Sequence, residues 1–400
     1  MNSKLKVQLS ILQFFQYYIW GSWYVTAGTY LINELGFSGT QVGWVYGATA
    51  ISAFISPFLS GLLADRFFSV ERLLGSFHFL GGILLFFMSE TTTFFWFYSL
   101  LLIYTFLFVP TFALSTSVVF HHIVDRSKDF PQIRVWGTIG WIVAGLVVGM
   151  LHWEATALPM KMSAIGSIIM AIYCFILPQT PPPQSKQSSL GAILGQEGRA
   201  LFAKRAFIIF VIGITLIRIP SSFYYSFVNP FLHELGMQNT AGKMTLGQLS
   251  ELIIMLSMPF LLRHIRLKAI LVIGMLTWGI RYLLFSYGNM EGNLWMLYGG
   301  IILHGVAFNF TALVSQIYVD QIVPPHLRST AQGFIAFLTL GCGALAGAYI
   351  AGWVVEAYAF TNGLHAWSSI WKYPASIAAV VALFFILLFW PNKKEKHVPT

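Results

Sequence analysis

The chain has 400 residues, of which 57% are hydrophobic and only 9% are charged. Soluble domains carry roughly 25% charged residues, so this composition cannot build a water-soluble surface, and the lipid bilayer must be the main solvent. The formal net charge of +9 could indicate nucleic-acid binding. Most basic residues, however, lie in short stretches between apolar runs, which is typical of cytoplasmic loops and argues against a nucleic-acid partner.

Twelve apolar segments follow one another along the chain, and each is long enough to cross a bilayer as a helix. The first starts after Lys4 and Lys6 and is too long for the apolar core of a cleaved signal peptide. The expected segments are Gln8–Ile32, Thr40–Ala64, Leu73–Ser89, Thr93–Val119, Gln132–Leu151, Met160–Leu177, Ala206–Leu232, Met244–Leu262, Lys268–Ser286, Asn293–Ile317, Ser329–Val355 and Trp367–Trp390.

A polar stretch rich in Pro, Gln and Ser separates the first six segments from the last six, and it reads as a cytoplasmic linker. We therefore expect an all-α membrane protein with twelve transmembrane helices in two pseudo-symmetric six-helix bundles. The expected parts are an N-terminal bundle (1–178), the linker (179–205), a C-terminal bundle (206–391) and a cytoplasmic tail (392–400). Such halves pack around a central cavity and rock to expose it to either face of the membrane.

The basic residues predict the orientation of the chain, because Lys and Arg concentrate in cytoplasmic loops. If the amino terminus is cytoplasmic, the connections on the outside hold only Lys161 and Lys243 among the loop basic residues. Both termini are then expected in the cytoplasm. The two cysteines, Cys174 and Cys342, fall inside expected helices, where an extracellular disulfide framework has no place.

The loop after the second segment carries a charged motif. Residues 61–66 read GLLADR, and Arg72 follows. The motif resembles the G-x-L-A-D-R signature of the major facilitator superfamily, in which the Asp caps a neighbouring helix and the basic residues brace the closed bundle. That resemblance implies a gating role for Asp65, Arg66 and Arg72; the alternative is an ordinary solvated loop.

The fifth segment places three polar or aromatic side chains on one stripe. Arg134, Thr138 and Trp141 are spaced i, i+4 and i+7. A guanidinium group, a hydroxyl group and an indole ring on one face could hold a flat polar ligand. The alternative is that Arg134 snorkels to the headgroups, since it lies near the end of its helix.

The eighth segment carries a carboxyl group in apolar surroundings. Glu251 lies among Leu249, Ile253 and Ile254, and Gln248 shares its face one turn earlier. A carboxyl group sheltered from water can exchange a proton near neutral pH, which a proton-coupled carrier requires. The alternative is a structural ion pair between Glu251 and Arg281 of the ninth segment or Arg218 of the seventh.

Candidates with less support from the sequence lie in the tenth and first segments. His304 and Phe308 are spaced i, i+4, and His304 could titrate near neutral pH or simply donate one hydrogen bond. In the first segment, polar and aromatic residues near one face could line the cavity, namely Gln13, Gln16, Trp20 and Trp23.

Several sequence patterns are absent, and their absence narrows the function. The chain has no G-x-x-x-x-G-K-[ST] phosphate loop, no H-E-x-x-H, no paired C-x-x-C and no G-x-S-x-G. We therefore expect neither an enzyme nor a metal or cofactor site, and transport driven by an ion gradient remains.

The chain resembles the nucleoside:proton symporters of the major facilitator superfamily over nearly its whole length. The resemblance is densest in residues 20–23, 129–140, 229–233 and 329–333. It implies that the family's substrate contacts fall on candidate residues described above and on two more residues in the seventh segment, Ser222 and Tyr225. The implied set is Arg134, Thr138, Trp141, Ser222, Tyr225, Gln248, Glu251, His304 and Phe308.

The chain also departs from the family pattern. Ser222 and Tyr225 stand at amide-bearing positions, His304 at a tyrosine, and Asn309 at an acidic residue. Because Asn309 cannot carry a proton, proton coupling is expected to fall on Glu251 or His304.

The resemblance implies a monomer that imports nucleosides with protons across the bacterial inner membrane. The alternatives are a related carrier or exporter of another polar solute, such as a sugar or a nucleobase, and a transport-derived sensor.

Overall fold

The computed structural model describes residues 3–64, 69–123, 125–181, 204–324 and 327–390, and within these ranges the side chains of 55–64, 126–128 and 329 are not described. Each of the twelve expected segments is mostly helical over the part that is described. Nine helices of this part are long and apolar enough to cross a membrane. The fold prediction is therefore confirmed.

Seven helices come from the first half of the chain, and α1 and α2 together make up the first expected segment. Their bounds are α1 (Ser3–Trp23), α2 (Ala27–Asn33), α3 (Gly39–Ala64), α4 (Val70–Ser89), α5 (Phe94–His122), α6 (Arg126–Met150) and α7 (Leu158–Cys174).

In the second half, three of the six expected segments are broken into shorter helices. Their bounds are α10 (Arg205–Leu216), α11 (Arg218–Glu234), α12 (Thr240–His264), α13 (Leu267–Tyr287), α14 (Leu294–Ile302), α15 (His304–Phe308), the π-helix η1 (Asn309–Leu313), α16 (Val314–Ile322), α17 (Arg328–Ala336), the π-helix η3 (Phe337–Gly343), α18 (Ala344–Ala357) and α19 (Trp367–Leu388).

Contacts within the chain define two compact units. The first unit contains α1 to α7 together with residues 225–233 of α11 and 237–245. The second unit contains α10, the beginning of α11, and the described residues from 246 onward. The first unit thus includes a piece of chain from beyond the linker.

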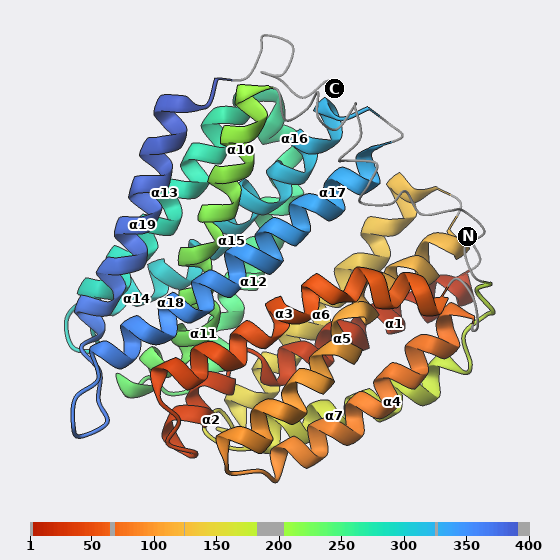
Figure 1. Cartoon of the computed structure of the whole chain (residues 1–400), viewed down its shortest axis with the longest axis horizontal. Coiled ribbons are helices and arrows are strands. Elements are labelled where there is room, and N and C mark those ends of the chain that lie inside the picture. Colours follow the sequence, from red (N-terminus) through yellow and green to blue (C-terminus); the bar gives the residue numbers. More distant parts are fainter. Residues whose placement is uncertain (1–2, 65–68, 124, 182–203, 325–326, 391–400) are drawn as a thin grey trace. The chain divides into compact units, whose positions relative to one another are not determined.

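In the first unit, α1 packs against α6 and α7, and α4 packs against α5 and α7 (Figure 1). Glycine permits the closest of these approaches. A Cβ atom on Gly140 of α6 would lie 3.0 Å from the carbonyl carbon of Phe14 on α1, and closer still to its oxygen. Small residues at such crossings are how membrane helices pack without a hydrophobic driving force.

A buried polar cluster lies in the interior of the first unit. Gln16 of α1 donates to the hydroxyl oxygen of Thr111 on α5 at 2.7 Å, and its side-chain oxygen lies 3.1 Å from Nε2 of His78 on α4. Gln16 has no exposed surface. The expectation that Gln16 lines a cavity is therefore wrong, because both ends of its amide hold neighbouring helices together.

Two further hydrogen bonds in the first unit join residues that are 200 positions apart. Thr29 donates to the side-chain oxygen of Asn229 at 2.5 Å, and the side chains of Asn33 and His233 meet at 3.0 Å. In both places the chain then turns at a glycine with positive φ, +66° at Gly36 and +80° at a second glycine 200 residues later. Glycine adopts this conformation at little cost, which makes it the usual helix terminator. The two helix ends thus share a terminating glycine at the same spacing of 200 residues, as expected if the two halves are repeats.

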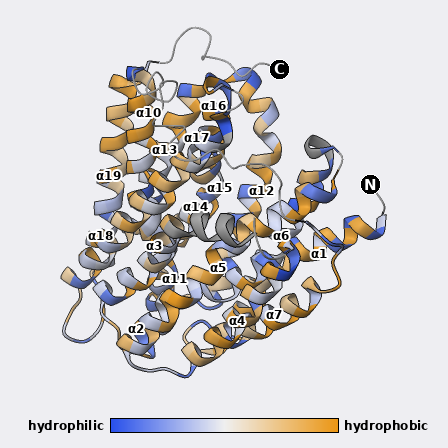
Figure 2. Ribbon diagram, turned by 45° about the vertical axis from the view of Figure 1, so that its right-hand side comes forward, coloured by the Kyte–Doolittle hydropathy of each residue, from blue (hydrophilic) through white to orange (hydrophobic). Residues whose placement is uncertain are grey.

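The second unit is organised around α13, which packs against α19, α14, α15 and η1. Its core is aromatic, and Tyr282 of α13 stacks on Trp371 of α19 with ring centroids 5.5 Å apart. Figure 2 shows hydrophobic residues along most of α10 and α19. Exposed apolar side chains on helices of this length are expected where lipid is the solvent.

Candidate functional site

The tenth segment changes its winding where the candidate residues lie. The α-helical turn α15 ends at Phe308, and the π-helix η1 starts at Asn309. Asn309 is buried, and its side-chain amide donates to the backbone carbonyls of Glu251 at 2.9 Å and Gly305 at 3.0 Å. A single π-helical turn inside a longer helix often marks a functional site. Here it lets one side chain tie the tenth segment to α12.

Gly305 brings α15 against α12. A Cβ atom at this position would lie 2.5 Å from the backbone nitrogen of Glu251, and closer still to the carbonyl carbon and side-chain oxygen of Ser250. Such distances are far inside van der Waals contact, so only glycine fits without a shift of the backbone. The close approach places Glu251 beside the residue that precedes Gly305, which is His304.

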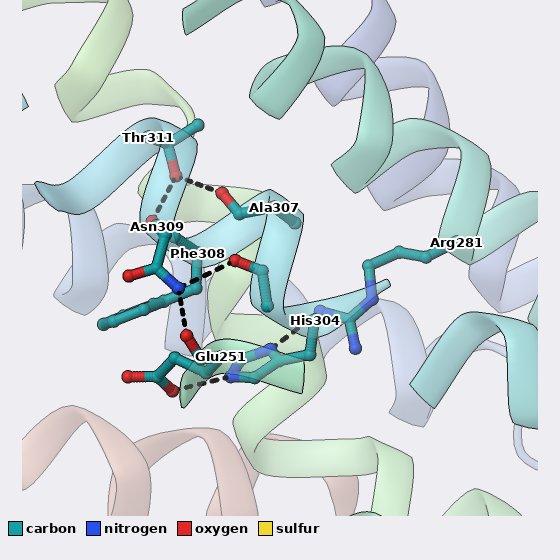
Figure 3. A network of polar contacts seen from close by, with 8 residues as sticks. Glu251, Arg281, His304, Ala307, Phe308, Asn309 and Thr311 are labelled. Carbon is teal, nitrogen blue, oxygen red and sulfur yellow. Dashed lines mark hydrogen bonds and ion pairs between the residues drawn. The ribbon is translucent and has the colours of Figure 1, made fainter. Parts of the chain in front are cut away.

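Three side chains then form a polar chain inside the second unit (Figure 3). Arg281 of α13 lies with Nη1 3.0 Å from Nδ1 of His304, and Nε2 of His304 lies 3.9 Å from a carboxylate oxygen of Glu251. In Figure 3 the guanidinium and the carboxylate approach the imidazole ring from opposite sides. The ring therefore connects a permanent cation to a group that can take up a proton.

The cationic end of this chain is the most deeply buried. Arg281 is 0% exposed, whereas the side chain of Glu251 is 27% exposed. The guanidinium donates from Nε to the carbonyl of Gly300 at 3.0 Å, and it lies 4.0 Å from the ring centroid of Tyr224. An aromatic face and a carbonyl can hold a buried cation because both present negative potential to it.

Aromatic rings enclose the imidazole. Tyr224 of α11 stacks on His304 with centroids 4.6 Å apart, and Phe308 lies 5.7 Å away on the same helical turn. The i, i+4 spacing of His304 and Phe308 thus brings the two rings together, as the sequence predicts. Tyr224 did not stand out in the sequence because its role depends on packing between helices.

The remaining candidates of the second unit lie on either side of this cluster. Gln248 is buried on α12, one turn before Glu251, while Leu249 and Ile253 are 46% and 56% exposed on the outside of the helix. Ser222 of α11 donates to backbone carbonyls, either that of Arg218 at 3.1 Å or that of Ala344 at 3.3 Å.

The candidates of the first unit gather where α6 faces α1. The guanidinium of Arg134 lies 4.0 Å from the ring centroid of Tyr17. Gly137 makes room for both groups, since a Cβ atom there would lie 2.6 Å from the Tyr17 ring and 2.8 Å from Nη1 of Arg134. Arg134 therefore stacks on a neighbouring helix, while remaining half-buried.

Further along the same face, Trp141 contacts the ring of Trp20 at 5.9 Å between centroids. Thr138 lies between Arg134 and Trp141 and is half-buried. Tyr225 also belongs to this unit, and its ring lies 6.3 Å from that of Tyr24. Two members of the predicted stripe, Arg134 and Trp141, therefore contact aromatic residues of α1.

The expected gating residues fall partly outside the described structure. Asp65 and Arg66 lie outside the described residues, and Arg72 is exposed near the start of α4. The preceding residue, Glu71, is buried instead of exposed. Its carboxylate accepts a hydrogen bond of 2.8 Å from the backbone nitrogen of Thr180.

The chain is similar to known proteins over nearly its whole length. A family model described as "Nucleoside H+ symporter" matches residues 2–394. The chain is 37% identical to the putative nucleoside transporter YegT of Escherichia coli over 98% of this chain and 95% of that protein. It is 32% identical to the nucleoside permease NupG of the same organism, over 98% and 97% of the two chains.

The fold is also similar to that of a solved structure. The crystal structure of the nucleoside transporter NupG aligns with a TM-score of 0.89 and 32% sequence identity, covering 98% of this chain and 100% of that chain.

Proposed function

The chain belongs to the nucleoside H+ symporter family, and it is a proton-coupled nucleoside transporter and not an enzyme. From that premise we propose which residues bind the nucleoside and which couple its movement to the proton. The fold, with twelve membrane segments in two halves, is that of the major facilitator superfamily.

We propose that the stripe on α6 and the cluster on α12 and α15 each contribute contacts to the nucleoside. Arg134, Thr138 and Gln248 offer hydrogen bonds to ribose hydroxyls and base edges, because together they provide donors and acceptors in fixed positions. Trp141 and Phe308 offer faces on which a base can stack. Four further residues that the family resemblance implies complete the proposed contact set, namely Ser222, Tyr225, Glu251 and His304.

Proton coupling is proposed for Glu251 and His304. The observation that carries this proposal is the polar chain from Arg281 through His304 to Glu251, which lies in helices that cross the membrane. Ionisable groups at such positions are expensive, and they mark ion pathways and proton relays. Glu251 is the member of the chain with partial exposure, so solvent can deliver a proton to it.

We further propose the arrangement of the transporter in the bacterial inner membrane. Residues 1–178 and 206–391 would be the two rocking bundles, joined by the linker 179–205, with both termini in the cytoplasm and the chain a monomer. Asp65, Arg66 and Arg72 would brace the cytoplasmic side when it closes. Support comes from the sorting of Lys and Arg between loops and from the repeat of 200 residues seen at Gly36 and Gly236.

Uptake into proteoliposomes tests the coupling proposal. Labelled uridine and adenosine should accumulate when an inward proton gradient is imposed, and the accumulation should stop when the gradient is collapsed. Glu251→Gln should abolish gradient-driven accumulation while still allowing exchange of nucleoside across the membrane. Glu291→Gln is the matched control, because Glu291 is exposed in the loop after α13. Accumulation by Glu251→Gln equal to that of the control would refute the assignment.

Competition with a panel of ligands tests the substrate class. Uridine, adenosine, free nucleobases and ribose should be compared as inhibitors of labelled uridine uptake. Intact nucleosides should compete best, because both the stacking faces and the hydrogen-bonding groups are then occupied. Stronger competition by a base or a sugar alone would favour a carrier of that solute instead.

A further inference from the structure

We infer that Arg281 is a positioning residue that fixes the tautomer of His304, holding the ring neutral with its proton on Nε2 and aimed at Glu251. His304 is then a fixed donor, and Glu251 alone takes up the transported proton. The inference rests on the proposed proton-coupling role of this pair and decides between its two members.

The hydrogen-bonding capacity of the side chains dictates the tautomer. An arginine side chain has only donors and stays protonated in proteins. Its Nη1 lies 3.0 Å from Nδ1 of His304, so Nδ1 must accept. A neutral imidazole that accepts at one nitrogen carries its proton on the other. The proton of His304 is therefore on Nε2, the atom that lies 3.9 Å from the carboxylate of Glu251.

Arg281 cannot easily turn away from this contact. Its Nε donates to the carbonyl of Gly300, and the guanidinium lies 4.0 Å from the ring centroid of Tyr224 and 4.9 Å from that of Trp278. The side chain is completely buried. Because three neighbours define its position, the donor facing Nδ1 is fixed by packing.

A second proton on His304 is opposed by every cation that faces the ring. A protonated ring would turn Nδ1 into a donor that points at the donor of Arg281, and it would place two positive charges next to each other in a buried site. Arg218 carries another positive charge on α11, the helix that also contributes Tyr224 to this cluster. Tyr224 contributes a stacked face, and Glu251 is the one carboxylate of this group. The balance of charges keeps His304 neutral.

The coupling role of Glu251 follows from the same geometry. The Nε2–H group of His304 faces the carboxylate as a donor, and Glu251 is the partly exposed group of the chain, so it is the group that can receive a proton. The contact of 3.9 Å is longer than a hydrogen bond, and such contacts commonly tighten when substrate binds. His304 thus faces Glu251 as a fixed donor without changing its own charge.

Spectroscopy of His304 in the full-length chain provides the direct test. Nitrogen-15 NMR of histidine-labelled protein in liposomes distinguishes a protonated ring nitrogen from an unprotonated one, and His304→Gln identifies the signals of His304. We expect unprotonated Nδ1 and protonated Nε2 at every pH from about 5 to 8, the range in which a histidine normally titrates. In Arg281→Gln the constraint is removed, and His304 should become doubly protonated toward the acidic end of that range.

A flux measurement separates the two possible proton carriers. In His304→Gln, the amide oxygen can accept from Arg281 and the amide nitrogen can donate to Glu251, yet an amide cannot carry a proton. We expect the uptake rate to fall several-fold while the ratio of proton flux to nucleoside flux stays the same. Loss of that ratio, or a charged His304 in the unaltered protein at the pH of transport, would overturn the inference. If Arg281→Gln fails to fold, the unaltered protein and His304→Gln still decide the matter.

These outcomes are distinguishable from failure of the proposed function. Absence of any gradient-driven nucleoside uptake by the unaltered protein would refute the proposed function, whereas the tautomer of His304 can be read from protein that is not transporting.

Discussion

Gly305→Ala tests whether the close approach of α15 and α12 assembles the coupling site. The new Cβ atom would lie 2.5 Å from the nitrogen of Glu251, whereas ordinary contact begins near 3.4 Å, so the two backbones must separate by about 1 Å. Overpacking of this kind costs about 1–3 kcal/mol. The separation also lengthens the hydrogen bond from Asn309 to the Glu251 carbonyl, and such bonds in membrane proteins contribute about 0.6 kcal/mol.

The effect on transport should exceed the effect on stability. A shift of about 1 Å at a functional site can lower a rate by about a hundredfold. We therefore expect gradient-driven uridine uptake to fall by about ten- to a hundredfold, with a moderately lower thermal midpoint in detergent. Gly299→Ala is the matched control, because its Cβ would meet only the flexible end of Leu284, at 3.3 Å. Equal uptake and equal midpoints for the two variants would refute the argument from close approach.

Two further predictions concern the first unit. Arg134→Lys should weaken nucleoside binding about tenfold, or about 1.4 kcal/mol, because lysine keeps the charge but loses the planar group that stacks on Tyr17. Calorimetric titration of the purified protein measures this affinity. An unchanged affinity would favour snorkelling of Arg134 instead. Asn229→Ala should destabilise the protein by about 1–3 kcal/mol, because it removes the buried partners of Thr29 at 2.5 Å and Thr240 at 3.2 Å; an unchanged thermal midpoint in detergent would contradict this.

The membrane segments could be predicted from the sequence because the length of an apolar run is a local signal. A helix that must satisfy its own backbone in lipid needs about 20 such residues, whatever its neighbours are. The breaks inside the segments were not predicted. The π-helix starts at Asn309, whose side chain bonds to the carbonyl of Glu251 on another helix, and no spacing within the tenth segment reveals that partner.

The orientation of polar side chains was predicted where one helix decides it and missed where two helices do. Arg134 lies with Trp141 on one face of α6 because helical periodicity alone places them there. Gln16 also looked like a cavity residue, yet its side-chain amide bonds to Thr111 and His78. A polar side chain in a membrane helix serves either a ligand or a neighbouring helix, and only the packed structure separates these roles.

The side chain next to Glu251 also could not be predicted from the sequence, and its identity bears on the proposed proton coupling. Sequence spacing offered Arg281 or Arg218 as an ion-pair partner, and the structure places the guanidinium of Arg281 on the far side of His304 instead. A direct ion pair would hold the carboxylate ionised and oppose proton uptake. With the imidazole ring between them, the attraction between guanidinium and carboxylate is weaker than in a direct contact, since it falls with distance. If Glu251 carries the transported proton as proposed, the interposed histidine reduces the attraction that would oppose proton uptake.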